Sequence, residues 1–345
     1  EADMINRLVW METDNTYPYR NLAMEEYMTL HVPQGTCILY LWQNRHTVVI
    51  GKNQNCWREC RVNFLEQEDG YLVRRLSGGG AVFHDLGNLN FTFIVGAEDY
   101  DVSRQLDVIL EAVRSLGIHA EKTGRNDITV EGRKFSGNAF YRTGDGCYHH
   151  GTILIRADKE NMSRYLNVSK EKLASKGVTS VKSRVANLCE FKPDITLEEV
   201  KAALVEAFSR VYGQPAVRMK EEELPQLEID VLTEKFASWQ WKYGRKIPFE
   251  YEMEKRFPWG NIQIQLHVDE GVIQDVNVFS DAMDQEMFGA LAKQLKGCGY
   301  AEEDICAAVE AVGPDAFQAE EHTGTDVPQS RQIKEDIKAL VRESL

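Results

Sequence analysis

Three successive glycines follow a predicted strand in Val73–Asp85, VRRLSGGGAVFHD. Glycine has no Cβ, so its backbone N–H groups can approach a ligand closely, and such a turn can form an anion-binding concavity. The pattern lacks the Gly-Lys-Ser/Thr of a P-loop, and Phe83 stands where the dinucleotide fingerprint requires glycine. We interpret it as a binding turn; a glycine-rich hairpin without a ligand is the alternative. Neighbouring side chains on a strand face opposite ways, so only one of Arg74 and Arg75 is expected to reach the site.

A hairpin that brings an acid and a lysine together is predicted in Gly124–Ala139, GRNDITVEGRKFSGNA. A strand over Asp127–Val130, a turn at Glu131–Gly132 and a second strand would place Asp127 and Lys134 at the same end, before a further turn at the Ser-Gly-Asn sequence. Such a pair suits activation of a carboxylic acid. The acid can hold Mg²⁺ that bridges phosphates, and the ammonium stabilises charge on a phosphate and an attacking carboxylate. A surface salt bridge is the alternative.

A third motif, GDGCYHHGT, covers Gly144–Thr152 and leads into a strand. His149 and His150 face opposite sides of an extended chain, so they are not expected to bind one metal together. Cys147 beside them could act as a thiolate nucleophile. Packing and hydrogen bonding of these side chains is the alternative.

Short segments rich in β-branched and aromatic residues predict strands. They are Thr36–Trp42 and His46–Gly51, joined by a hairpin turn at Asn44–Arg45, and then Leu89–Val95 and Gly151–Arg156. Helical spacing of apolar residues predicts helices over Leu22–Leu30, over Ser103–Gly117 with its first residue as N-cap, and over Thr196–Gly213 with a capping box of Thr196 and Glu199. Because no regular series of strand–helix units follows, we predict an α+β fold with a mixed sheet.

A change of pattern near residues 243–258, marked by Gly and Pro breakers, divides the chain. We expect a catalytic domain over residues 1–245, a linker over 246–257 and an accessory domain over 258–345. The elements expected in this last part are a strand over Ile262–Val268, its hairpin partner Val272–Phe279 across Glu270–Gly271, a helix over Met283–Lys296, a polar loop over His322–Ser330 and a helix over Gln329–Ser344.

Charge is distributed unevenly along the chain, whose net charge is −14. Glu254–Leu345 holds 8 basic and 18 acidic residues, whereas Glu121–Arg184 holds 13 basic and 7 acidic ones. An acidic chain with one basic segment is not typical of nucleic-acid binding and favours a local site for a small polyanion or an acidic partner. Apolar segments fall far short of the ~20 residues of a membrane span. The odd number of cysteines, 7, and the lack of a leader pattern predict a cytoplasmic protein.

The three motifs, in this order, resemble those of bacterial lipoate–protein ligases with a C-terminal accessory domain. The pattern RRxSGGGAVFHDxGN is matched by Arg74–Asn88, GRNDxxVxGxKxSGNA by Gly124–Ala139 and HHGTxL by His149–Leu154. Two further stretches, Thr47–Glu59 and Leu173–Leu188, resemble the family as well. The resemblance implies a biotin/lipoyl-protein ligase fold, which is α+β with a mixed sheet and related to class II aminoacyl-tRNA synthetase cores, plus a small α/β C-terminal domain.

The resemblance also implies a reaction in two steps. ATP and lipoate form lipoyl-AMP and pyrophosphate, and a lysine amine of an acceptor lipoyl domain then displaces AMP to form an amide. The implied cofactors are ATP and Mg²⁺. The implied partners are free lipoate and the lipoyl domains of 2-oxoacid dehydrogenase E2 subunits, the H protein of glycine cleavage, or both. A monomer is expected, and the basic segment Glu121–Arg184 is expected to meet the acceptor.

Site residues are implied by the matching motif positions. Lys134 is the expected catalytic residue, contacting the lipoyl carbonyl and the α-phosphate, and Asp127 is the candidate to hold Mg²⁺ through phosphates. The residues expected around the nucleotide are Arg75, Ser77, Gly78, Gly79, Gly80, Ala81, Val82, Phe83, Asn88, Asp127 and Lys134. Those expected around lipoate are Leu22, Gly79, His84, Lys134 and His150.

Two other functions stay open at this point. A lipoyl or octanoyl acyltransferase would carry its acyl group as a thioester on Cys147 and would not need ATP. A non-catalytic protein would only hold lipoyl-AMP or dock lipoyl domains. The accessory domain and the presence of Lys134 within an intact GRND motif favour the ligase.

Overall fold

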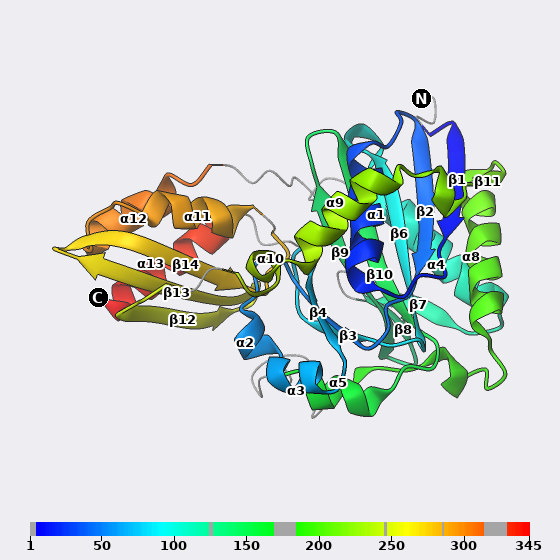
Figure 1. Cartoon of the computed structure of the whole chain (residues 1–345), viewed down its shortest axis with the longest axis horizontal. Helices are drawn as coiled ribbons and strands as arrows, with labels where there is room; N and C mark the ends of the chain where they lie inside the picture. Colours follow the sequence, from blue (N-terminus) through cyan, green and yellow to red (C-terminus); the bar gives the residue numbers. More distant parts are fainter. Residues whose placement is uncertain (1–4, 124–126, 169–183, 245–246, 285, 314–329) are drawn as a thin grey trace.

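The computed structural model of the chain describes residues 5–123, 127–168, 184–244, 247–284, 286–313 and 330–345. Figure 1 shows a large part built around a long sheet and a small part formed by the C-terminal residues. Within the described residues, none of the helices combines the length and apolar character needed to cross a membrane.

The large sheet has eight strands in the order β11-β1-β2-β6-β10-β9-β8-β7. The first three are parallel to one another and the others run antiparallel to their neighbours, so the sheet is mixed, as predicted. Its strands are β1 (Arg7–Glu12), β2 (Thr36–Trp42), β6 (Asn88–Gly96), β7 (Ala120–Thr123), β8 (Asp127–Val130), β9 (Arg133–Arg142), β10 (Gly146–Leu154) and β11 (Ala216–Arg218). The helical elements of the large part are α1 (Pro18–Leu30), α2 (Cys56–Glu59), α3 (Val62–Gln67), η1 (Ala97–Asp99), α4 (Val102–Ser115), α5 (Lys159–Tyr165), η2 (Leu188–Glu190), α8 (Leu197–Tyr212), η3 (Glu221–Glu223), α9 (Gln226–Ala237) and α10 (Trp239–Tyr243).

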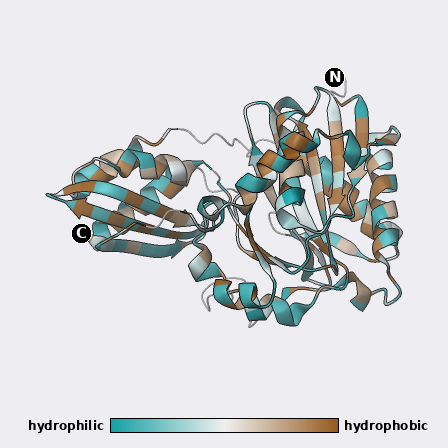
Figure 2. Cartoon of the chain, viewed as in Figure 1, coloured by the Kyte–Doolittle hydropathy of each residue, from teal (hydrophilic) through white to brown (hydrophobic). Residues whose placement is uncertain are grey.

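Helices cover both faces of the large sheet, because successive side chains of a strand point to opposite faces. Leu39 and Phe93 belong to the apolar cluster under α4 and α8. Tyr40 and Trp42 belong to the cluster under α1 and α9. The apolar residues of the central strands lie between these layers (Figure 2).

Helix ends follow the predicted local signals in part. α8 has the predicted capping box of Thr196 and Glu199 and ends at Gly213, which has a φ of +71°. The prediction that Ser103 caps α4 is wrong, because Asp101 is the N-cap and its side chain accepts from the amide of Arg104. α1 starts earlier than predicted, because proline at its first position has a backbone angle suited to a helix.

The predicted hairpin between Thr36–Trp42 and His46–Gly51 is wrong. Both segments are strands, but β3 (Thr47–Ile50) lies in a separate sheet between β4 (Tyr71–Arg74) and β5 (Val82–His84). The connecting Asn44 is buried and bonds to Asn21 and His84, so it anchors the link to the core instead of forming an exposed turn.

The small part is an antiparallel sheet covered by helices. The predicted hairpin across Glu270–Gly271 is confirmed, with both residues at positive φ. β12 lies inside the segment 246–257 that we expected to be a linker, yet it pairs with β13, so the linker assignment is wrong for these residues. The predicted loop at 322–329 lies outside the described residues. The elements are β12 (Tyr251–Phe257), β13 (Gly260–Asp269), β14 (Val272–Ser280), α11 (Met287–Leu295), α12 (Glu302–Glu310) and α13 (Ser330–Ser344).

Candidate active site

The glycine turn, residues 75–81, connects β4 to β5 and is held by one buried guanidinium. Arg75 donates through Nε to Ser77 Oγ at 3.0 Å. Its Nη2 donates to the carbonyl oxygens of Gly78 and Gly80 at 2.7 and 2.8 Å. Burial lowers the pKa of Arg75 to about 10, which still leaves it charged at neutral pH. Because the carbonyl oxygens of Gly78 and Gly80 point toward the guanidinium, the backbone N–H groups of the turn can point away from it.

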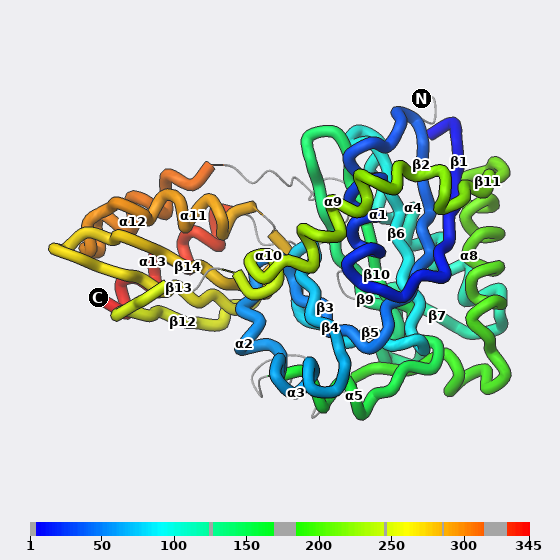
Figure 3. Tube along the Cα trace, viewed as in Figure 1, coloured from blue at the N-terminus to red at the C-terminus, as the bar shows by residue number. Residues whose placement is uncertain are grey.

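Arg74 binds backbone carbonyl oxygens of two other segments. It donates to the carbonyl oxygens of Gln54 at 2.6 Å and Lys52 at 3.0 Å. It also donates to those of Trp241 and Lys242, both at 3.0 Å. The two arginines therefore face different surroundings, as predicted. Arg74 connects α10 to residues 52–54, which follow β3. α10 lies beside β4, the strand that ends at Arg74 (Figure 3).

The small part of the protein covers the glycine turn. The amide of Gly79 donates to the carbonyl oxygen of Ala282 at 2.9 Å. A Cβ on Gly78 would lie 2.4 Å from the carbonyl oxygen of Met283. Gly79 itself has a φ of +92°, which favours glycine. The close approach and the backbone angle both require glycine here, and the amide of Gly79 is paired with protein in this conformation.

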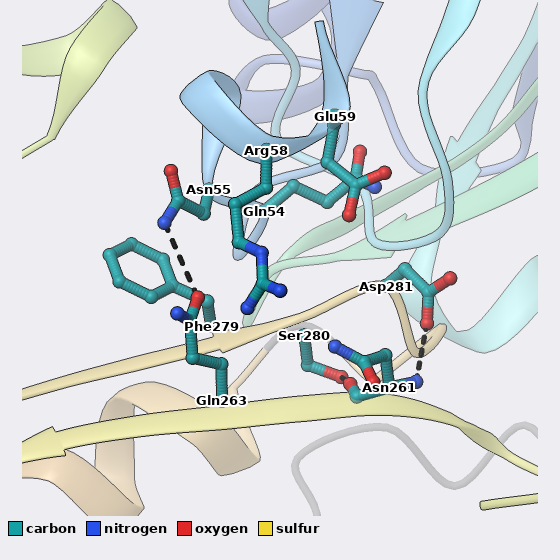
Figure 4. Close-up of a pocket in the computed structure, with 9 residues that line it drawn as sticks. All are labelled: Gln54, Asn55, Arg58, Glu59, Asn261, Gln263, Phe279, Ser280 and Asp281. Carbon is teal, nitrogen blue, oxygen red and sulfur yellow. Dashed lines mark hydrogen bonds between the residues drawn. The ribbon is translucent and has the colours of Figure 1, made fainter. Parts of the chain in front are cut away.

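Polar contacts dominate around this junction. Lys52 Nζ lies 2.7 Å from Glu286 Oε1, and the amide of Ser280 donates to the carbonyl oxygen of Asn53 at 2.8 Å. Figure 4 shows a pocket between the region of α2 and the strands of the small part. Its lining residues are Gln54, Asn55, Arg58, Glu59, Asn261, Gln263, Phe279, Ser280 and Asp281. Polar interfaces of this kind are compatible with relative motion of the parts.

A buried chain of hydrogen bonds connects the turn to α1. His150 Nε2 lies 2.7 Å from Ser77 Oγ, and His150 Nδ1 lies 2.8 Å from Glu25 Oε1. Glu25 also accepts from Thr92 Oγ1 at 2.7 Å, and Thr92 in turn accepts from Trp42 Nε1 at 2.9 Å. Because Glu25 accepts both bonds, the proton of the imidazole belongs on Nδ1, and Nε2 accepts from Ser77. These hydrogen bonds thus fix the orientation of the His150 ring relative to the glycine turn.

Lys134 and Asp127 meet as the hairpin prediction requires. Lys134 Nζ lies 2.6 Å from Asp127 Oδ1. The predicted turn at Glu131–Gly132 is confirmed, with φ values of +51° and +74°. The further turn predicted at Ser136–Asn138 is wrong, because these residues continue β9 and pair with β8 and β10.

Glycine at position 137 makes room for the catalytic candidate. A Cβ on Gly137 would lie 2.8 Å from Lys134 Cε and 2.9 Å from Lys134 Nζ, so the lysine side chain lies across this glycine. The amide of Gly137 donates to Thr152 Oγ1 at 3.2 Å, and Thr152 shares its sheet face with His150 two residues away. The ammonium of Lys134 therefore lies on the same face as the buried chain of His150.

Three of the residues expected around lipoate and the nucleotide, Leu22, His84 and Asn88, are buried. Leu22 packs in the cluster that contains Trp42, and the ring of His84 lies 6.4 Å from that of Trp42. Burial lowers the pKa of His84 to about 3, so its imidazole is neutral. The side chain of Asn88 donates to that of Asn90 at 2.9 Å.

The residues that follow the turn divide between two sides of β5. Val82 packs against the cluster of α1, whereas Phe83 is buried on the opposite side and stacks on Tyr165 at 5.4 Å. Ala81 precedes them and packs against the same cluster as Phe83. Only the backbone of Phe83 is therefore available to a ligand at the turn.

Cys147 is separated from this arrangement. It is buried in the cluster under α4 and α8, on the sheet face opposite to His150. Burial raises the pKa of its thiol to about 11, so the thiolate is disfavoured at neutral pH. This placement argues against Cys147 as the nucleophile of an acyltransferase.

Glu25, Thr92 and Trp42 of the buried chain of hydrogen bonds were not among the predicted site residues, and neither was Arg184, whose Nη2 lies 3.6 Å from Asp127 Oδ2. A signal for Glu25 exists, because Glu25 and Glu26 are acids within a mostly apolar helix pattern. Arg184 lies in the stretch Leu173–Leu188 that resembles the family, but only the fold brings it to Asp127.

Comparisons with known proteins show the family of the chain. The family model of the lipoyl protein ligase A/B catalytic domain matches residues 17–209, and that of the bacterial lipoate protein ligase C-terminus matches residues 246–323. The first match covers more than half of the chain. The chain therefore belongs to the lipoate–protein ligase family and is an enzyme of that class.

Solved structures share the fold. P. falciparum LipL1, in complex with lipoate, is 27% identical with a TM-score of 0.80, over 96% of this chain and 99% of that one. A bi-partite lipoate protein ligase of Thermoplasma acidophilum, described with its E2 lipoyl domain, is 27% identical with a TM-score of 0.60, over 71% and 99%. Lipoate-protein ligase A bound with ATP is 25% identical with a TM-score of 0.59, over 70% and 99%.

Proposed function

We propose that this ligase joins free lipoate to a lysine of acceptor lipoyl domains in an ATP-dependent reaction through lipoyl-AMP. The observation that carries the proposal is the position of Lys134, whose ammonium lies across Gly137 on the sheet face of His150. The lipoate of P. falciparum LipL1 and the ATP of lipoate-protein ligase A support the choice of both substrates.

In the first step, a carboxylate oxygen of lipoate attacks the α-phosphorus of ATP, and pyrophosphate leaves. A free carboxylate is a poor acyl donor at neutral pH, and the mixed anhydride supplies a good leaving group. Lys134 stabilises the charge shared by the carboxylate and the α-phosphate. In the second step, the acceptor amine attacks the lipoyl carbonyl and AMP leaves, with Lys134 at the same oxygen atoms.

Asp127 fits a role in holding Mg²⁺ through phosphates. Its carboxylate is 30% exposed and both of its oxygens face cations. Within the described residues, no three His, Cys, Asp or Glu side chains gather as a metal site. A single carboxylate completed by phosphate oxygens and water is the arrangement that Mg²⁺ commonly adopts. The metal would neutralise phosphate charge, and Asp127 would orient it.

The glycine turn supplies amides to the adenylate, with Ser77 and the backbone of residues 78–83 along it. Arg75 holds the turn open by binding its carbonyl oxygens. Because the amide of Gly79 is paired with Ala282, ligand binding at this amide requires the small part to move. We propose that Leu22 and His84 contact the lipoyl chain.

The acceptors that we propose are lipoyl domains, in line with the E2 lipoyl domain described with the T. acidophilum ligase. The H protein of glycine cleavage is a second acceptor of the same kind. We propose that the basic segment between residues 121 and 184 attracts the acceptor through its charge. We propose a monomer that acts in the cytoplasm.

Release of pyrophosphate from ATP, Mg²⁺ and lipoate, followed by transfer of labelled lipoate to purified acceptors, tests this function. The expected result is one pyrophosphate released for each lipoyl group transferred. Lipoyl transfer without any release of pyrophosphate would instead support the acyltransferase. Pyrophosphate release without transfer would show that the proposed acceptors are wrong.

A further inference from the structure

A second cation shares the carboxylate of Asp127 with Lys134. Lys134 Nζ lies 2.6 Å from Oδ1, and Arg184 Nη2 lies 3.6 Å from Oδ2. The side chain of Arg184 is 28% exposed, so it can reach a ligand that approaches from solvent. Within the described residues, these three side chains bring two positive charges and one negative charge together.

Main-chain contacts place Arg184 beside Lys134. Val185 pairs with Lys134 in a parallel bridge, and the amide of Ala186 donates to the carbonyl oxygen of Lys134 at 2.8 Å. Arg184 directly precedes these two residues. Its backbone position relative to Lys134 is therefore set by the fold and does not depend on the exposed ion pair alone.

We propose that Arg184 binds the phosphate next to the one that Lys134 contacts and stabilises the leaving pyrophosphate. The inference rests on the proposed function. In adenylation a carboxylate oxygen forms a bond to the α-phosphorus, and the bond from that phosphorus to the bridging oxygen breaks. The electron pair of the broken bond stays on pyrophosphate, and no proton is transferred. Negative charge therefore develops on the pyrophosphate, next to the α-phosphate that Lys134 contacts.

The chemistry of arginine suits this role. A guanidinium offers two parallel N–H donors to the oxygens of one phosphate, whereas an ammonium acts as a point charge. Asp127 orients the guanidinium before ATP binds. When Mg²⁺ and phosphates reach Asp127, the guanidinium can exchange the carboxylate for a phosphate without leaving the site.

Arg133 provides a matched control. It directly precedes Lys134 on β9, so its side chain points to the other face of the strand. Its Nη1 lies 2.7 Å from Glu190 Oε2, and its side chain is 34% exposed. Removing either arginine thus deletes one charge from a comparable exposed ion pair, which contributes little to stability. Of these two arginines, Arg184 is the one with an ion pair to Asp127.

The test compares Arg184→Ala, Arg133→Ala and Lys134→Ala in the two half-reactions. Pyrophosphate release from ATP and lipoate measures adenylation, and reaction of supplied lipoyl-AMP with a purified lipoyl domain measures transfer. Arg184→Ala is expected to lower kcat/KM for adenylation about 10- to 100-fold, as for loss of one electrostatic partner, and to leave kcat for transfer, measured at saturating lipoyl domain, within about twofold. Lys134→Ala is expected to slow both steps, and Arg133→Ala to leave adenylation and this kcat for transfer unchanged.

Arg184→Lys, which keeps the charge but not the paired donors, is expected to recover only part of the adenylation rate. It also replaces Arg184→Ala if that variant does not fold. Adenylation by the Arg184 variants at the wild-type rate, or an equal loss in both half-reactions, would overturn the role of Arg184 while leaving the ligase function standing. Failure of the wild-type enzyme itself to release pyrophosphate would overturn the proposed function.

Discussion

The backbone amide of Gly79 donates a hydrogen bond to the carbonyl oxygen of Ala282, which joins the glycine turn to the small part of the protein. A ligand that binds the Gly79 amide must displace residues 280–284 from the glycine turn. Beside them, the amide of Ser280 is paired with the carbonyl oxygen of Asn53. We expect lipoyl-AMP to accelerate hydrogen exchange of the Ser280 amide while the Gly79 amide stays protected. Slower exchange at Ser280 would show that the parts do not separate.

Lys134→Ala is expected to fold normally and to lower adenylation by at least ~100-fold, because the side chain is partly exposed and stabilises charge in the transition state. Lys122→Ala is the control, since Lys122, on β7 of the same sheet, forms an exposed ion pair with Asp107 of α4. Circular dichroism checks the fold, and pyrophosphate release measures the rate. A near-normal rate would show that Lys134 is misassigned.

Gly137→Ala is expected to lower adenylation about 10-fold or more with little loss of stability. The new Cβ would meet only the far end of the Lys134 side chain, which can move away and lose its catalytic position. Gly144→Ala serves as the control, because a Cβ there meets nothing within 4 Å. Thermal unfolding and the rate of pyrophosphate release separate the two effects. A large stability loss with unchanged kcat would contradict the geometry.

Cys147→Ala is expected to keep full ligation of free lipoate, because the thiol is buried on the sheet face opposite to His150. The variant should lose about 1 kcal/mol of stability, a typical effect of a small change in the core. Transfer of labelled lipoate in the presence of ATP provides the measurement. Complete loss of transfer by a folded variant would reinstate the acyltransferase.

Acid should destabilise the fold through His149. Burial lowers the pKa of this imidazole to about 3, below its ordinary value of 6.5. The neutral imidazole thus contributes stability that is complete above pH 6.5 and is lost as the pH falls toward 3. The expected loss is about 2 kcal/mol between pH 7.5 and 5.

Urea unfolding of wild type and His149→Gln over this pH range checks the effect. The variant should show a smaller change between the two pH values, whatever its stability at pH 7.5. His31→Gln, at an exposed position, should keep the wild-type change. Parallel pH profiles of wild type and His149→Gln would rule out the contribution of this histidine.

Several elements could be read from local sequence because their causes are local. The capping box of Thr196 and Glu199 and the glycine after the helix satisfy helix-end groups within a few residues. The turn at Glu131–Gly132 joins two neighbouring strands, so it also brought Asp127 to Lys134 as predicted. The family motifs identified the glycine turn and the lysine because both are contiguous in sequence.

Other features could not be predicted because their causes are distant in sequence. Asn44 looked like a turn residue, but its burial against His84 separates β2 from β3. The Ser-Gly-Asn sequence looked like a turn, but pairing with β10 keeps it extended. The local pattern of residues 246–257 predicted a linker, but β12 forms within this segment because it pairs with β13. In each case a contact with another segment outweighs the local preference.

The sequence by itself determined which residues are candidates for the chemistry: the triple-glycine turn, Lys134 with Asp127, and the histidine pair. Only the tertiary structure decided how they combine, with His150 joined to Ser77 and Glu25, Cys147 turned to the other face, and Arg184 brought to Asp127. The physical reason is that residue type sets what a side chain can donate, accept or hold as charge. Sheet register and packing between distant segments set what it faces.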